Sequence, residues 1–275
     1  MADLSLPAGR TLGAAGGARG GWRLVDYTPG VVESATRVSE TLFLLRVRLL
    51  KGLTSPLPPQ FVMVWVPGLE AVPMSVAGFK GSRLDLLVKP VGDTTRRLVE
   101  LGAGGRLGLY GPLGRPLIPP GRRFLFVAGG SGLAPILYYL DYLECSVRSV
   151  CEVAVGFNKS VEAGSAGRLV EEKGGRPVVY CLDTGCDEKG VVLDHLKSVD
   201  PGSYDALVLS GPPEMINSSP RFLGREYWGR VIVVAEALVK CGLGLCGSCR
   251  LPWNPGLYLC VDGPGFYLTQ LLGVV

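Results

Sequence analysis

Four of the eight cysteines of this 275-residue chain fall within twenty residues near its C-terminal end. Cys241, Cys246, Cys249 and Cys260 are spaced C-x4-C-x2-C-x10-C. Four thiolates can converge on one inorganic centre, and the spacing of the first three is one that ligates [2Fe-2S] clusters. The sequence therefore predicts an iron–sulfur site carried by these four residues.

The residues between the cysteines suit a loop that wraps closely around such a centre. Glycine allows positive φ and a close approach of the backbone, which a cluster-binding loop requires. Asn254-Pro255-Gly256 follows the third cysteine and suits a type II turn with Pro at i+1 and Gly at i+2. A short hairpin is therefore expected to bring Cys260 back beside Cys249. The glycines concerned are Gly242, Gly244 and Gly247.

Structural zinc and disulfides are the alternatives to a cluster. Zinc sites usually present their cysteines as two close pairs, and only Cys246 and Cys249 have that spacing. Eight cysteines are too sparse for a disulfide scaffold, and the N-terminal segment lacks the apolar core of a secretory signal. The other four share no ligand spacing, and we expect them to be buried apolar thiols. They are Cys145, Cys151, Cys181 and Cys186.

Composition excludes several classes of function. The chain is 47% hydrophobic, which is ample for buried cores, but it has no apolar run long enough to cross a membrane. The net charge of +4 is small and dispersed, so neither a nucleic acid nor a membrane is expected as a partner. A cytoplasmic location is expected. The single histidine, His195, argues against a histidine-based triad and is expected on the surface of a short helix.

The texture of the sequence divides the chain into four parts. Residues 1–21 are rich in Gly and Ala and are expected to be a disordered lead-in. Residues 22–118 contain short β-rich runs separated by Gly and Pro, which is typical of a β-barrel. Strands alternate with helices over residues 119–225, which indicates an open, mainly parallel α/β sheet. Residues 226–275 form the segment that carries the four cysteines.

Two stretches could receive phosphate groups. In V-A-G-G-S-G-L-A-P-I, Gly129, Gly130 and Gly132 lie where a strand turns into a helix, so backbone N–H groups and the positive helix end could approach a phosphate. The motif is not G-x-G-x-x-G, and a tight turn without a ligand is an equal interpretation. Thr94 and Thr95 stand at the start of a predicted helix, where they could cap it or contact a diphosphate.

The order of these motifs resembles that of a known family. P-x-S-V is followed by G-x-T-T-x-x-L, G-P-L-G, G-G-S-G-L-A-P-I, S-G-P-P-E-M and the four cysteines. Over residues 22–270 the chain resembles ferredoxin-reductase-like flavoproteins, and most closely the electron-transfer subunits of B-type dihydroorotate dehydrogenases. The resemblance implies a six-stranded FAD-binding β-barrel, an α/β nucleotide-binding-like domain and a C-terminal [2Fe-2S] segment.

The resemblance also implies roles for individual residues. Ser75 is expected near the flavin and Ser210 near the nicotinamide, neither of them as an acid–base catalyst. The residues that match the family's FAD motifs are Val72, Pro73, Met74, Ser75, Leu87, Val88, Lys89, Thr94 and Thr95. Those that match its NAD-side motifs are Gly129, Gly130, Ser131, Gly132, Leu133, Ala134, Pro135, Ser210, Gly211 and Pro212. The cluster ligands correspond to Cys241, Cys246, Cys249 and Cys260.

Two residues depart from the family pattern. Val72 stands where the family has arginine, which removes a bidentate partner for the FAD diphosphate. Thr94 stands where the family has glycine, so the backbone is expected to approach the diphosphate less closely. Lys89, Arg96 and Arg97 are candidates for the replacement charge.

The resemblance implies a redox relay in which FAD exchanges a hydride with NAD and single electrons with the cluster. The implied partner is an FMN-containing catalytic subunit that oxidises dihydroorotate, two copies of each forming a heterotetramer, so the pyrimidine never touches this chain. The choice between NAD and NADP stays open, because no clear acidic residue follows a second strand. Alternatives are a flavin subunit of an NAD(P)H:ferredoxin, sulfide or hydrogenase oxidoreductase, and a cluster-bearing docking subunit without FAD or NAD use.

Overall fold

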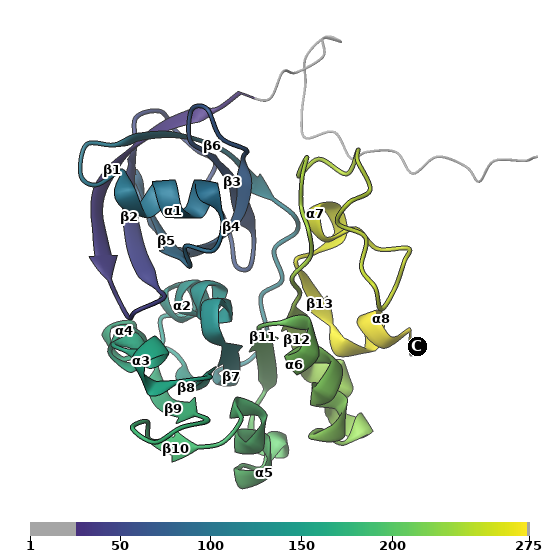
Figure 1. Ribbon diagram of the computed structural model, residues 1–275. Helices are drawn as coiled ribbons and strands as arrows, with labels where there is room; N and C mark the ends of the chain where they lie inside the picture. Colours follow the sequence, from purple (N-terminus) through teal and green to yellow (C-terminus); the bar gives the residue numbers. More distant parts are fainter. Residues whose placement is uncertain (1–25, 274–275) are drawn as a thin grey trace, which may run out of the picture.

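The computed structural model describes residues 26–273, in which a β-barrel and an α/β sheet lie side by side (Figure 1). The predicted lead-in over residues 1–21 lies outside the described residues. Within residues 26–273, no helix combines the length and apolar character needed to cross a bilayer.

The barrel is closed by six antiparallel strands in the order β1-β2-β5-β4-β3-β6. Side chains alternate along its strands, as in β2, where Leu45 and Val47 are buried while Arg46 and Arg48 face solvent. The barrel was predicted from short β-rich runs separated by Gly and Pro, and this alternation is a further feature of its strands. Its elements are β1 (Thr28–Arg37), β2 (Phe43–Leu49), β3 (Phe61–Trp65), β4 (Val72–Lys80), β5 (Arg83–Val88), α1 (Asp93–Glu100) and β6 (Arg106–Leu113).

The second sheet has seven strands in the order β10-β9-β8-β7-β11-β12-β13. All neighbours pair in parallel except β13, which is antiparallel to β12. Central strands are continuous apolar runs because helices and loops cover both faces. The elements are β7 (Arg123–Gly129), α2 (Leu133–Tyr142), β8 (Val150–Phe157), α3 (Ser160–Ala163), α4 (Ala166–Glu172), β9 (Arg176–Cys181), β10 (Glu188–Lys189), α5 (His195–Ser198), β11 (Ala206–Ser210), α6 (Pro213–Ser218), β12 (Val231–Val234), α7 (Leu259–Asp262), β13 (Gly265–Tyr267) and α8 (Leu268–Leu272).

Helix α2 joins the barrel to the sheet. Its residues from Leu133 to Leu140 are all buried, which is the pattern of a helix covered on every side. The Tyr138 hydroxyl donates to the carbonyl of Pro56 at 2.5 Å, and the Tyr139 hydroxyl donates to the carbonyl of Leu117 at 2.7 Å. These bonds satisfy both phenols inside the protein and hold the two domains together. The helix itself lies between the barrel and the sheet (Figure 1).

The cysteine-bearing segment leaves the sheet after β12 and returns to it at β13. The two strands are hydrogen-bonded neighbours, and the amide of Ala235 donates to the carbonyl of Pro264 at 2.9 Å. The loop between them therefore has ends that are fixed side by side.

Two sequence predictions are wrong in this domain. His195 is buried, not on the surface: its Nδ1 lies 3.1 Å from the Tyr180 hydroxyl, and burial lowers its pKa. The four scattered cysteines are not free thiols. They form two disulfides, Cys145–Cys151 and Cys181–Cys186, each with a Cα–Cα distance of 5.7 Å. Tight turns bring the partners together, which ligand spacing cannot reveal.

Candidate functional site

The four cysteines of the C-terminal segment form two pairs. The Sγ atoms of Cys249 and Cys260 are 3.2 Å apart. Cys241 and Cys246 lie on the same glycine-rich loop, and Cys241 is one of the groups that lower the pKa of the Cys246 thiol. Within residues 26–273, no three His, Cys, Asp or Glu side chains are grouped around the position of a single metal ion. Two thiol pairs match a cluster of two irons, in which each iron takes two cysteines.

Backbone N–H groups point at the sulfur atoms. The amide of Gly244 donates to Cys260 Sγ at 3.2 Å, and the amide of Leu243 donates to Cys241 Sγ at 3.4 Å. Such donors stabilise thiolates. The predicted use of glycine is confirmed, because Gly242, Gly244 and Gly247 all have φ between 65° and 75°.

The hairpin predicted to return Cys260 to Cys249 is present. Leu251 and Leu257 pair across it, and the amide of Leu259 donates to the carbonyl of Cys249 at 2.9 Å. The turn is closed by the amide of Leu257 and the carbonyl of Asn254, but it is not type II. The φ angle of Gly256 is not positive, whereas a type II turn requires a positive φ at that position.

The electrostatics of the two pairs differ. Burial, followed by the neighbouring Cys249, raises the pKa of the Cys260 thiol to about 12. Hydrogen bonds from Ser248 and Cys241 lower the pKa of the exposed Cys246 thiol to about 6. A cluster would bind all four cysteines as thiolates. A bound cation would therefore stabilise the thiolate form most strongly in the buried pair.

The cysteine segment packs against the end of the barrel. The Tyr110 hydroxyl donates to the carbonyl of Cys241 at 3.1 Å, and burial raises the pKa of this phenol to about 12. A Cβ on Gly242 would come within 2.6 Å of Leu113, so only glycine allows this contact. The iron–sulfur segment is therefore attached directly to strand β6.

A cavity of about 390 Å³ lies between the barrel, the sheet and the cysteine segment. Phe61, Met74 and Leu87 supply apolar walls, and Ser75 and Lys89 supply polar groups. Pro73 and Thr95 also line it, so six of the nine residues matched to FAD motifs meet here. Its lining does not include the other three, which are Val72, Val88 and Thr94.

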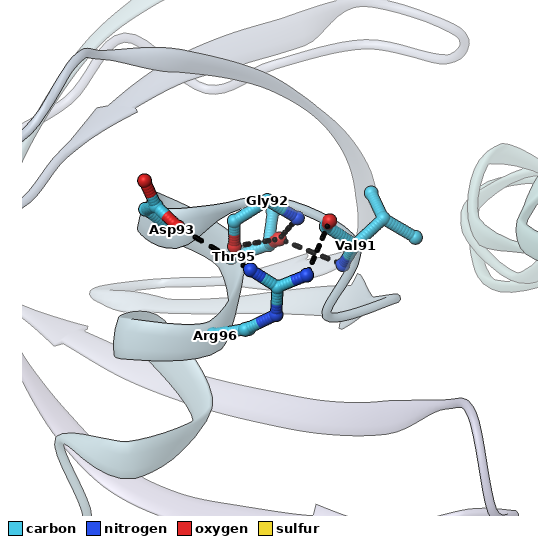
Figure 2. Close-up of polar contacts among 5 residues, drawn as sticks. All are labelled: Val91, Gly92, Asp93, Thr95 and Arg96. Carbon is cyan, nitrogen blue, oxygen red and sulfur yellow. Dashed lines mark hydrogen bonds and ion pairs between the residues drawn. The ribbon is translucent and has the colours of Figure 1, made fainter.

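The two threonines make different local bonds. Thr94 is buried, and its hydroxyl donates to the carbonyl of Glu70 at 2.8 Å. The Thr95 hydroxyl caps helix α1, accepting from the amides of Val91 at 3.0 Å and Gly92 at 2.9 Å (Figure 2). The Arg96 guanidinium donates to the carbonyl of Val91 and to the carboxylate of Asp93, so it lies against the same turn (Figure 2). The diphosphate role of both threonines stays a prediction.

A second cavity, of about 810 Å³, opens at the carboxyl ends of the parallel strands. Gly129 and Gly130 line it where β7 turns toward α2. Gly132 is buried against the backbone of Ser210, where any Cβ would clash with the carbonyl oxygen. Ser210 and Gly211 are also buried, and they lie behind the cavity lining. This edge of an open α/β sheet is where such folds bind ligands.

Three residues line both cavities: Lys89, Ser131 and Glu236. Glu236 follows β12 and is a site residue that sequence analysis missed. Although it keeps solvent exposure, burial raises the pKa of its carboxyl group, Glu214 raises it further and Lys89 opposes the rise. Its position directly after an apolar strand, V-I-V-V-A-E, was the available signal, because functional side chains gather at strand ends.

The residues present fit a flavin in the first cavity and a cluster at the cysteines. Apolar walls with a hydroxyl and an ammonium group suit a ring system with polar edges. Lys89 is the cation of that wall, since Arg96 and Arg97 are paired with Asp93 and Glu100. A barrel, a parallel sheet and a four-cysteine loop that meet at two joined cavities define a ferredoxin-reductase-like protein with an iron–sulfur segment.

Comparison with known proteins agrees with this class. Residues 236–272 match the model of the iron–sulfur cluster binding domain of dihydroorotate dehydrogenase B. Among solved structures, the NADH-dependent reduced ferredoxin–NADP oxidoreductase superposes with a TM-score of 0.74 at 23% identity, covering 92% of this chain and 95% of that one. A ferredoxin–NADP+ reductase from Neisseria gonorrhoeae gives 0.62 at 16% identity, covering 75% and 97%.

Curated relatives identify the family. The probable dihydroorotate dehydrogenase B (NAD+) electron transfer subunit of Archaeoglobus fulgidus is 34% identical over 78% of this chain and 87% of its own length. The corresponding protein of Thermoplasma volcanium is 32% identical over 78% and 80%. The chain therefore belongs to the family of dihydroorotate dehydrogenase B electron transfer subunits, as the order of its motifs predicted.

Proposed function

We propose that this chain carries electrons between a dihydroorotate-oxidising partner and NAD, through a [2Fe-2S] cluster and FAD. The four cysteines would ligate the cluster, the first cavity would hold the flavin and the second would hold the nicotinamide. FAD supplies the adapter between one-electron and two-electron chemistry. The role we propose lies in pyrimidine biosynthesis, and the location we propose is the cytoplasm.

One observation supports this proposal above the others. Leu259 lines the first cavity, and the next residue, Cys260, belongs to the buried thiol pair. A group in the cavity would therefore lie one residue from a cluster ligand. Since Lys89, Ser131 and Glu236 line both cavities, the flavin and nicotinamide sites would also be in direct contact.

The residues of the chain would bind and orient the redox groups. Ser75 in the first cavity offers a hydroxyl to a ring edge, and Lys89 offers a positive charge near it. Apolar walls exclude water from the same space, which strengthens both interactions. Neither Ser75 nor Ser210 is assigned an acid–base role.

The partner we propose is an FMN-containing catalytic subunit, in a heterotetramer of two copies of each chain. The relatives are named as electron transfer subunits, which supports a separate catalytic chain. The exposed side of the cysteine loop would face it, because Leu245 is 82% exposed and Cys246 next to it is also exposed.

A visible absorption spectrum of anaerobically purified protein, with iron and flavin quantified, tests the proposal. Flavin bands, two irons per chain and bleaching of the flavin by NADH would support the relay. Iron without flavin would overturn it in favour of a cluster-bearing docking subunit. Two features would then explain the missing FAD: Val72 stands in place of the family's arginine, and the Thr94 hydroxyl is already hydrogen-bonded to the carbonyl of Glu70.

A further inference from the structure

The Cys181–Cys186 disulfide closes a short loop at the outer end of the second cavity. Cys181 ends β9, and the chain turns back within six residues so that β10 pairs with β9 in parallel. Parallel neighbours normally require a crossover of a dozen or more residues. The disulfide spans this unusually short return.

Apart from the disulfide, few bonds hold β10 to the sheet, one of them from the amide of Gly190 to the carbonyl of Cys181 at 2.9 Å. The strand contains only Glu188 and Lys189, both exposed, at the edge of the sheet. One carboxylate assists it, since Asp187 accepts from the amide of Val179 at 2.8 Å. A two-residue edge strand is a weak element by itself.

The segment that this loop controls forms a wall of the second cavity. Leu182 lies inside the disulfide loop, and Gly190, Val191 and Val192 directly follow β10; all four line the cavity. Asp183, also inside the loop, accepts from the amide and the hydroxyl of Ser160 at the start of α3. Through this bond the loop also contacts helix α3, whose residue Glu162 lines the same cavity.

The two disulfides differ in their access to solvent. Cys145 and Cys151 are both buried, whereas Cys186 is partly exposed and residues 182–185 beside it are exposed. Thiol–disulfide exchange requires a thiolate to reach one of the sulfur atoms. The Cys186 sulfur is the accessible one of the four.

We propose that Cys181–Cys186 is a reversible redox site that sets the affinity of the second cavity for a dinucleotide. A dithiol reductant attacks Cys186 Sγ and releases Cys181 as a thiolate, which takes a proton. The second thiol of the reductant then resolves the mixed disulfide, so two electrons and two protons pass to the protein and the reductant becomes a disulfide. The freed loop lets Leu182, Gly190 and Val191 move away from the cavity while the buried Val192 stays in the core, and dinucleotide affinity falls. The inference rests on the proposed function of the second cavity.

The first experiment measures which disulfide is reduced. Holoprotein is titrated anaerobically with dithiothreitol, alkylated with iodoacetamide, and its cysteine peptides are quantified by mass spectrometry. Labelling at Cys181 and Cys186 is expected before labelling at Cys145 and Cys151. Simultaneous or reversed labelling would overturn the proposal, and so would a free Cys181 and Cys186 in air-oxidised protein.

The second experiment measures NADH affinity by calorimetry on two double variants with intact FAD and iron content. In Cys181→Ala/Cys186→Ala the NADH dissociation constant is expected to rise about tenfold, which corresponds to a binding-competent cavity in about one molecule in ten. The matched control, Cys145→Ala/Cys151→Ala, is expected to bind as the wild type does. Equal affinity in both variants and the wild type would refute the redox site. Absence of NADH binding in the oxidised wild type would instead refute the proposed function of the cavity.

Discussion

The Sγ atoms of Cys249 and Cys260 lie 3.2 Å apart although eleven positions separate the residues in the chain. The hairpin between them does this through backbone pairing, with Leu251 and Leu257 opposite each other. The backbone of the hairpin thus places the two buried thiols side by side. Cys241 and Cys246 lie on the glycine-rich loop and form the more exposed pair.

Replacing Cys249 by Ser is expected to remove the visible spectrum of the cluster and leave the barrel folded. An alcohol is a poor ligand for iron, and the buried thiol pair loses one member. Iron content, visible absorption and far-ultraviolet circular dichroism measure the three properties. Leu245→Ala, in the same loop but with an 82% exposed side chain, serves as the control and should retain two irons per chain. A full cluster spectrum in Cys249→Ser would contradict the ligand assignment.

Replacing Thr95 by Val tests whether its hydroxyl only caps helix α1. The variant leaves the amide of Gly92 without its side-chain acceptor and removes one of the two acceptors of the Val91 amide, which should cost about 1 kcal/mol of unfolding free energy. Denaturant unfolding of flavin-free and flavin-loaded protein checks this. An equal loss in both forms indicates capping alone, and a larger loss in the loaded form indicates a contact with FAD. Thr94→Val, which removes the bond to Glu70, is the comparison variant.

Glu236 is expected to make NAD+ binding depend on pH. Because burial raises the pKa of this carboxyl group, it ionises at a higher pH than an ordinary glutamate, and its charge then attracts the positive nicotinamide ring. The NAD+ dissociation constant should therefore fall as pH rises through that pKa. In Glu236→Gln this dependence should vanish. Glu214→Gln should move it to lower pH, since Glu214 raises the pKa. An unchanged profile in Glu236→Gln would exclude this role.

Asp85 is expected to destabilise the fold when it is ionised. Among the described residues its Oδ1 has no hydrogen-bond partner, Arg83 being 3.5 Å away, and burial raises its pKa. A carboxyl group whose pKa is higher in the folded state favours folding below its unfolded pKa and opposes it above the folded value. Asp85→Asn should therefore add about 1 kcal/mol of stability at pH 7 and little near pH 4.

Thermal unfolding at the two pH values measures the effect of Asp85→Asn. Lys173 and Asp141, which form an ion pair beside Gly78 and Asp85, stay in place in this variant. A loss of stability at pH 7 would mean that the attraction to Lys173 and Arg83 outweighs the cost of burial.

Features that depend on local chemistry were predictable from the sequence. Short β-rich runs separated by Gly and Pro predicted the barrel, and apolar strands alternating with helices predicted the parallel sheet. The spacing of the cysteines and their glycines predicted the loop with positive φ. Features that depend on tertiary contacts were not. His195 is buried because Tyr180 faces it across the fold, and Cys181 meets Cys186 because β10 returns so sharply.

The site followed the same division. The family motifs correctly indicated that Ser75 and Lys89 belong to one site, and both line the first cavity. Nothing in the local sequence showed that the Thr94 hydroxyl would donate to the carbonyl of Glu70. Glu236 joined the site only because β12 ends between the two cavities.

The pairing of β12 with β13 has a consequence for how such proteins diversify. Since the amide of Ala235 bonds to the carbonyl of Pro264, the intervening loop leaves and re-enters the sheet at one place. A loop with adjoining ends tolerates replacement and changes of length without displacing the strands that hold it. The iron–sulfur segment thus enters and leaves the reductase frame at a single place, and its contact with strand β6 through Tyr110 fixes its orientation there.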